Sequence, residues 1–318
     1  NNAVVDSDYP YFIAREWDPG YRAARIAGLL REASADGVSP AEMSAIQSDT
    51  RVLRASLIGP RLAAAAPVTV DGQLVAERIR QWDGECATDS RGCAAYMVAE
   101  YRILRALFDD DLGPLARDYV GTPMSWQALI ALLDRPNDPW WDDARTTTTE
   151  TAAGLAAAAL DAAGADLRRD LGGPESWTWG RVHTTTWREG TLGNSGIGPL
   201  EWYFNRGPDP AAGAAGTVNN AYVLFVGAYD DPYTEGDVPT TDLRRLFSVT
   251  NLPSYRLVVD MADLDAARIV ITTGQSGNPF DPRYGDLIDD WLAGRQVPLP
   301  FSRDVVEAAG RATLTLTP

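Results

Sequence analysis

Apolar residues recur at helical spacing through most of the first half of the chain. Between Tyr21 and Arg31, for example, Ile26, Leu29 and Leu30 fall on one side of a helix. The same criterion predicts further helices over residues 40–46, 52–65, 75–82, 94–108, 125–133 and 149–171. The first half of the chain is therefore expected to be mainly helical.

One of these helices has a defined start. Ser39 is followed directly by Pro40 and, three positions after the serine, by Glu42. This is the pattern of a capping box, in which the serine and glutamate side chains each accept a hydrogen bond from the other residue's backbone. Proline also fits the first helical position. The sequence therefore predicts that this helix begins at Pro40.

After Gly172-Gly-Pro174 the pattern changes to strands and long loops. Strands are predicted over residues 221–229, 254–261, 267–273 and 312–317, and a helix over residues 284–293. Helices followed by strands favour an α+β fold over alternating βαβ units. We divide the chain into residues 1–172, a strand end and a mainly helical region, and residues 173–318, a β-rich region, both within one structural unit.

The first residues, Asn1 to Val5, resemble the end of a strand. A sheet that lacks its other strands has open edges and uncovered apolar faces. We therefore expect another chain or segment to complete this one. The sequence does not begin with Met, and an export signal is expected to lie upstream.

Composition and charge narrow the classes of partner. The chain has 318 residues, is 45% hydrophobic and carries a formal net charge of −16. Nucleic acid and anionic lipid would be repelled by this charge. No apolar run approaches the roughly 20 residues of a membrane span, and we predict no transmembrane segment. A small molecule or another protein is the expected partner.

Cys86 and Cys93 enclose a short polar loop between two predicted helices. A metal site lacks ligands, because the chain contains one His, and a disulfide is favoured. Such a bridge would contribute roughly 2–3 kcal/mol by the loop-entropy relation. It would also indicate an oxidising setting, so that we expect a secreted, periplasmic or cell-envelope protein.

Three segments together carry a resemblance to a known family. They are Asn1-Asn2 with Tyr9-Pro10 behind it, Trp177-Thr-Trp-Gly-Arg-Val-His183, and Gly274-Gln-Ser-Gly-Asn-Pro279. The combination resembles the penicillin amidase family of N-terminal-nucleophile hydrolases. The resemblance implies the C-terminal portion of a catalytic β-chain and a partial αββα sandwich with a helical insertion in the first half. The remaining α- and β-segments of the same precursor would be its partners.

The resemblance also implies a chemistry. Family members use an N-terminal Ser, Thr or Cys, whose own α-amino group serves as base. Asn1 cannot be that nucleophile, but an Asn side chain can donate a hydrogen bond to a tetrahedral oxyanion. The family pattern places this role on Asn1, or on Asn2 if the register shifts by one. The alternative is that both are strand-end residues that satisfy nearby backbone groups.

The family also has an Arg at the start of the following helix, close to the nucleophile and the oxyanion Asn. Arg22 matches that position, and the resemblance implies that it supports the catalytic geometry. The alternative is that Arg22 and Arg25 form a solvated helix face. Two departures, at Glu189 and Arg283, leave the implied fold intact but weaken any transfer of substrate preference.

His183 and Ser276 invite a different hypothesis, a serine hydrolase triad. The sequence around Ser276, Gly-Gln-Ser-Gly-Asn, does not fit the Gly-x-Ser-x-Gly nucleophile elbow. Packing and turn roles are therefore expected for both segments.

No cofactor is expected. The loop Gly193-Asn-Ser-Gly-Ile-Gly198 lacks the Lys of a phosphate-binding loop. Acidic runs such as Asp109 to Asp111 are typical of solvated loops. The resemblance allows one structural calcium, with ligands mostly outside this chain.

We therefore expect part of an acylase that hydrolyses an amide bond of an N-acylated small molecule, of penicillin, lipopeptide or acyl-homoserine lactone type, through an acyl-enzyme. The alternative is a non-catalytic relative that serves as a subunit or scaffold of a cell-envelope assembly.

Overall fold

A computed structural model describes residues 2–6, 8–33, 37–225, 241–310 and 315 of the chain. It divides into two compact units, each built from separate stretches. The first unit comprises residues 1–28, 49–188 and 205–252, and the second comprises residues 29–48, 189–204 and 253–318. The predicted boundary near residue 172 falls within the first unit.

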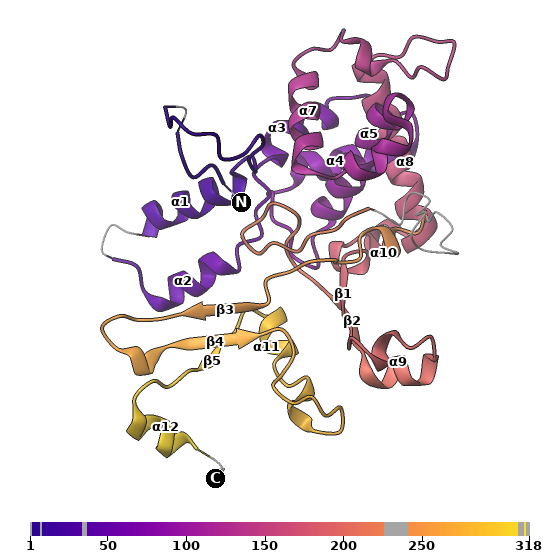
Figure 1. Cartoon of the computed structure of the whole chain (residues 1–318). Helices are drawn as coiled ribbons and strands as arrows, with labels where there is room; N and C mark the ends of the chain where they lie inside the picture. The colour runs from indigo at the N-terminus through magenta and orange to yellow at the C-terminus, as the bar shows by residue number, and fades with distance from the viewer. Residues whose placement is uncertain (1, 7, 34–36, 226–240, 311–314, 316–318) are drawn as a thin grey trace. The chain divides into compact units, whose positions relative to one another are not determined.

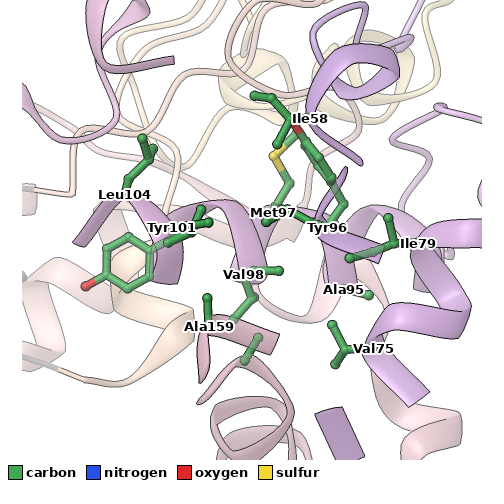
Figure 2. Packing of buried hydrophobic residues seen from close by; sticks show 14 of the residues in the cluster. Ile58, Val75, Ile79, Ala95, Tyr96, Met97, Val98, Tyr101, Leu104 and Ala159 are labelled. Atoms are coloured by element: carbon green, nitrogen blue, oxygen red, sulfur yellow. The ribbon is translucent and has the colours of Figure 1, made fainter. Parts of the chain in front are cut away.

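The first unit is mainly helical (Figure 1). Its helices are α3 (Ala55–Ala63), α4 (Val70–Gln81), α5 (Arg91–Leu112), α6 (Ala116–Tyr119), α7 (Pro123–Leu133), α8 (Ala152–Leu171) and α10 (Leu243–Leu246), together with the first turns of α1 (Tyr21–Ala33). The core lies where α3, α4, α5 and α8 pack together, as Figure 2 shows for Ile58, Val75, Val98 and Ala159.

The predicted helices are present, with shifted ends. α4 begins at Val70 rather than residue 75, because the side chain of Thr69 accepts a hydrogen bond from Gly72 N and caps the helix. α8 begins at Ala152 because Thr151 caps it in the same way. Asp71 and Gly72 interrupt the apolar spacing in the first turn of α4, so the sequence pattern did not show where this helix begins.

The first unit also contains an antiparallel pair that the sequence pattern missed, β1 (Thr184–Trp187) with β2 (Arg206–Pro210). The strand predicted over residues 221–229 was wrong for its described part. Residues 221–225 form only an isolated bridge, between Tyr222 and Asn251, because this stretch belongs to a buried loop. Residues 226–229 lie outside the described residues, as does the predicted strand over residues 312–317 except residue 315.

The second unit contains a three-stranded antiparallel sheet, in the order β3, β4, β5 (Figure 1). Its elements are α2 (Pro40–Gln47), α9 (Gly198–Phe204), β3 (Tyr255–Val258), β4 (Arg268–Ile271), α11 (Ile288–Leu292), β5 (Val297–Pro298) and α12 (Arg303–Ala309). The capping box of α2 is confirmed: Glu42 N donates to Ser39 Oγ, and Ser39 N donates to the Glu42 carboxylate. All strands of the described chain follow residue 172, which confirms the α+β class.

The two faces of this sheet differ. Arg256 and Val258 of β3 are buried, and the Arg256 guanidinium stacks on the Trp291 ring of α11, 4.2 Å from its centroid. The opposite face carries Tyr255 and Leu257, which are 59% and 37% exposed. The register places Ile271 opposite Tyr255, Ile269 opposite Leu257, and Val297 opposite Ile269. One face of the sheet is therefore apolar and partly exposed.

The strand end predicted at the start of the chain is not formed by residues 2–6, because no strand in the described ranges pairs with them. The stretch that leads to α1 instead exposes apolar side chains, with Val4, Tyr11 and Phe12 each more than 70% exposed. Among the described helices, none is long and apolar enough to cross a membrane.

Candidate functional site

The start of α1 carries Arg22 and lies against Asn2, two of the predicted site residues. Gly20 precedes the helix in a left-handed conformation, with φ of 78°. Its N–H donates to Asp18 Oδ1 at 3.0 Å, and its carbonyl accepts from Ala24 N at 2.8 Å. A Cβ on residue 20 would lie only 2.9 Å from the side-chain oxygen of Asn2. The carboxamide of Asn2 therefore lies directly against the glycine that begins the helix.

Asn2 lies beside Gly20, and Gly20 is two positions before Arg22. Asn1 lies outside the described residues. Arg22 is half-buried, and its side chain forms no hydrogen bond or ion pair with the described residues. The free N–H groups of a helix N-terminus and a guanidinium both favour negative charge. The Asp18 carboxylate already accepts one backbone N–H at this end of the helix, from Gly20.

Arg25 is not part of a solvated helix face. Its Nη2 donates to Asp49 Oδ2 at 2.6 Å, and its Nε lies 3.1 Å from both carboxylate oxygens. The two side chains are 20% and 10% exposed. Such a forked contact fixes the helix more firmly than a single ion pair would. The alternative in which Arg25 is a solvent-facing residue is therefore wrong.

His183 holds a buried loop and is not placed to act as a base. It is fully buried, and its Nδ1 and Nε2 lie 2.7 and 3.3 Å from the carbonyl oxygens of Ala211 and Ala221. Its ring stacks on Trp179, whose Nε1 donates to the Gly213 carbonyl. Burial lowers the pKa of His183 to about 4. The packing role expected for this segment is confirmed.

The loop that His183 holds spans residues 211–222, and we call it the buried loop. Other buried groups form hydrogen bonds with the backbone of this loop. Arg54 Nη1 donates to the Ala215 carbonyl, Gly213 N donates to the Cys86 carbonyl, and Asn219 N donates to the Asp49 carbonyl at 2.9 Å. A loop without regular structure can be buried only when its polar groups are paired in this way.

Arg54 also forms an ion pair with Glu100 that sequence reasoning missed. Nε and Nη2 donate to the two carboxylate oxygens at 2.9 and 2.8 Å, and Tyr96 donates to Glu100 Oε1 at 2.6 Å. Burial works against the charge on Arg54, but Glu100 raises its pKa above the ordinary value. Burial also raises the pKa of Tyr21, whose phenol at the start of α1 interacts with both charges.

The predicted disulfide is present. Cys86 and Cys93 are bonded, with their Cα atoms 5.2 Å apart, and both are fully buried. The bridge closes the turn between α4 and α5, where the backbone of Cys86 contacts the buried loop. The disulfide therefore stabilises the turn to which the buried loop is hydrogen-bonded.

Ser276 belongs to a turn, as expected. Its Oγ accepts from Asn278 N at 3.2 Å, and its N–H donates to the Arg283 carbonyl at 3.2 Å. A Cβ on Gly274 would lie 2.0 Å from that same carbonyl oxygen, so the close approach requires glycine. The glycine-rich signature thus closes a tight loop.

Within the described ranges, no group of three or more His, Cys, Asp or Glu side chains could hold a metal ion. The predicted calcium, whose ligands would come mostly from elsewhere, stays a prediction.

Comparison with known proteins places the chain in a family. The family model for penicillin amidase matches residues 1–308, and the chain belongs to the penicillin amidase family. This finding confirms the resemblance drawn from the three sequence segments.

Individual relatives show the same relationship. Acyl-homoserine lactone acylase QuiP of Pseudomonas aeruginosa is 30% identical over 347 residues, covering 100% of this chain and 39% of that protein. Penicillin acylase 2 proenzyme of a Pseudomonas species is 26% identical, covering 100% of this chain and 38% of that protein. The chain thus spans well under half the length of these relatives. A thermostable penicillin G acylase from Alcaligenes faecalis aligns in structure with a TM-score of 0.48 and 12% identity, over 97% of this chain and 53% of that one.

Proposed function

We propose that this chain is part of an acylase that hydrolyses the amide bond of an N-acylated small molecule through an acyl-enzyme. The match of the whole chain to 39% of an acyl-homoserine lactone acylase supports an N-acyl-homoserine lactone as the substrate to test first. The observation that carries the proposal is at the start of α1, where Asn2 lies against Gly20 and Arg22 follows two residues later.

In the proposed reaction, the hydroxyl or thiol of an N-terminal residue on another segment attacks the amide carbonyl. Its α-amino group takes the proton, directly or through water. The Asn1 side chain, or that of Asn2 in the shifted register, donates to the oxyanion, and Arg22 adds positive charge nearby. The intermediate collapses, the amine leaves with the proton, and water then hydrolyses the acyl-enzyme to release the acid.

The requirement for a partner segment rests on exposed apolar surface. Among the described residues of the second unit, the sheet face with Tyr255 and Leu257 stays partly exposed, at 59% and 37% for these side chains, while α11 contacts the opposite face through Arg256. A second sheet from the same precursor would cover it and complete an αββα sandwich. The exposed side chains between Val4 and Phe12 offer a further surface for that precursor. The disulfide supports a secreted, periplasmic or cell-envelope location.

The test uses the complete protein. Intact mass and N-terminal sequencing should find a co-purifying segment that begins with Ser, Thr or Cys. Incubation with an N-acyl-homoserine lactone should release free homoserine lactone and fatty acid in equal amounts, with penicillin as the parallel substrate. The absence of amine release from either substrate, or a partner that begins with another residue, contradicts the proposal.

A further inference from the structure

Asp49 connects the start of α1 to the buried interior of the first unit. Its carboxylate accepts the forked contact from Arg25, and its Oδ1 also accepts from Arg51 N at 3.3 Å. Its main-chain oxygen accepts from Asn219 N of the buried loop at 2.9 Å. One residue is thus bonded through its side chain to the helix and through its backbone to the loop.

Residues 49–52, which we call the platform, are held by backbone hydrogen bonds to the turn that the disulfide closes. Cys86 N donates to the Thr50 carbonyl at 3.1 Å, and Val52 N donates to the Gly84 carbonyl at 3.0 Å. This platform is therefore tied both to the disulfide turn and to the loop held by His183 and Arg54. Its position is fixed by buried contacts on several sides.

Arg25 lies three residues after Arg22, so the two side chains project from one side of α1, about 60° apart around the helix axis. When Arg25 is clamped, the rotation of α1 about its own axis is fixed. The direction in which Arg22 projects then follows from the Arg25–Asp49 contact. The position of Gly20, against which Asn2 lies, follows as well.

We propose that Asp49 is a positioning residue, which through Arg25 sets the orientation of α1 and thereby the placement of Arg22 and of the Asn beside Gly20. This inference rests on the proposed function, since it assigns Asp49 a task in that reaction. On this proposal Asp49 has no contact with the substrate. It acts through Arg25, and its carboxylate is needed because only a charged, two-oxygen acceptor matches the guanidinium fork.

The test compares Asp49→Asn with the wild type in the complete protein. Asp49→Asn removes the charge and one acceptor with little change in volume. We expect kcat to fall roughly 10- to 100-fold, because small misplacements of catalytic groups have effects of this size. KM should stay within about twofold of the wild type, since the acyl chain and leaving amine are not contacted. Asp49→Glu should restore part of the rate.

Two controls separate positioning from general stability. Glu85→Gln breaks the ion pair of Glu85 with Arg51, at 2.8 Å, on the same platform but without contact to α1, and kcat should be unchanged. The loss caused by Asp49→Asn should add less than fully to that of Arg22→Lys, because part of the Asp49 effect passes through the placement of the Arg22 guanidinium. If Asp49→Asn retains wild-type kcat per folded molecule, or if the two losses add fully, the inference is wrong.

Hydrogen exchange provides a readout that does not require turnover. Asp49→Asn should weaken amide protection in residues 21–28, whereas Glu85→Gln should not. Unchanged protection in residues 21–28 contradicts the inference even if activity falls. A wild-type protein that releases no amine contradicts the proposed function, and the exchange measurement still decides whether Asp49 holds α1.

Discussion

Arg54 and Glu100 form a bidentate ion pair inside the first unit, in which two hydrogen bonds join the side chains. Only 2% of the surface of Arg54 and 4% of that of Glu100 are exposed. The pair is completed by the Tyr96 hydroxyl on the carboxylate and by the Ala215 carbonyl on the guanidinium. Because desolvation of two charges offsets most of their attraction, such a pair contributes little net stability. It does hold the buried loop next to the start of α1.

Removal of one partner of this pair should be far more harmful than removal of the whole group. Glu100→Leu leaves a buried guanidinium without its counter-charge and should cost about 3–5 kcal/mol of stability. The triple variant Arg54→Met, Tyr96→Phe, Glu100→Leu should recover much of that loss. Urea denaturation of the complete protein measures both. Equal destabilisation of the single and triple variants would show that packing, not the buried charge, causes the loss.

His183 should make stability depend on pH. Its pKa is about 4 in the folded chain and about 6.5 when unfolded, so between these values the unfolded state binds more protons. Stability is therefore full above pH 6.5 and falls as the pH drops toward 4, by up to about 3 kcal/mol. The difference in unfolding free energy between the wild type and His183→Gln should shrink over this window. A constant difference from pH 7 to pH 4 would contradict the buried neutral imidazole.

The disulfide should stabilise the platform beside α1. Its reduction should lower stability by roughly 2–3 kcal/mol, the value expected for a short closed loop. The measurement compares thermal unfolding of the complete protein with and without reductant. The Cys86→Ala, Cys93→Ala variant serves as control and should not respond to reductant. A reductant effect of the same size in that variant would place the responsible bond elsewhere.

Gly20→Ala tests the contact between Asn2 and the start of α1. The new Cβ meets the Asn2 side-chain oxygen at 2.9 Å, and the left-handed backbone adds about 1–2 kcal/mol of strain. Gly196→Ala is a matched control, because Gly196 has φ of 73° and open space around it. We expect kcat to fall at least about tenfold for Gly20→Ala only. Equal kcat in the two variants would show that the contact between Asn2 and Gly20 does not contribute to catalysis.

Leu257→Asp tests the uncovered sheet face. A carboxylate on this face should disfavour its burial by a second apolar layer. We expect reduced recovery of the partner segment when the complete precursor is purified, as measured by intact mass and band intensity. Val306→Asp is the control, since Val306 is 46% exposed on α12. Normal recovery of the partner with Leu257→Asp would argue against an occupant on this face.

The sequence predicted those features that depend on local periodicity or on short motifs. The helices α1 and α5, the Ser39 capping box and the disulfide follow from apolar spacing, a four-residue pattern and the count of possible ligands. Family motifs pointed to the start of α1, where Asn2 and Arg22 lie in the same neighbourhood.

Long-range polar contacts could not be predicted in this way. Asp49 and Arg25 are 24 residues apart, and Arg54 and Glu100 are 46 residues apart, so neither pairing has a local signature. The one available signal was Glu100 itself, a charged residue on the apolar face of a predicted helix. The short strand β2, which contains two prolines, also escaped detection because proline is typical of loops.

The measurement that most directly tests the central claim is the steady-state kcat of the complete protein with Asn1→Ala and, separately, Asn2→Ala. Loss of an oxyanion donor should lower kcat by about 10²- to 10³-fold in one of the two variants, Asn1→Ala in the expected register, with the other close to wild type. Wild-type kcat in both variants would contradict the account, because no oxyanion donor would then come from the start of this chain.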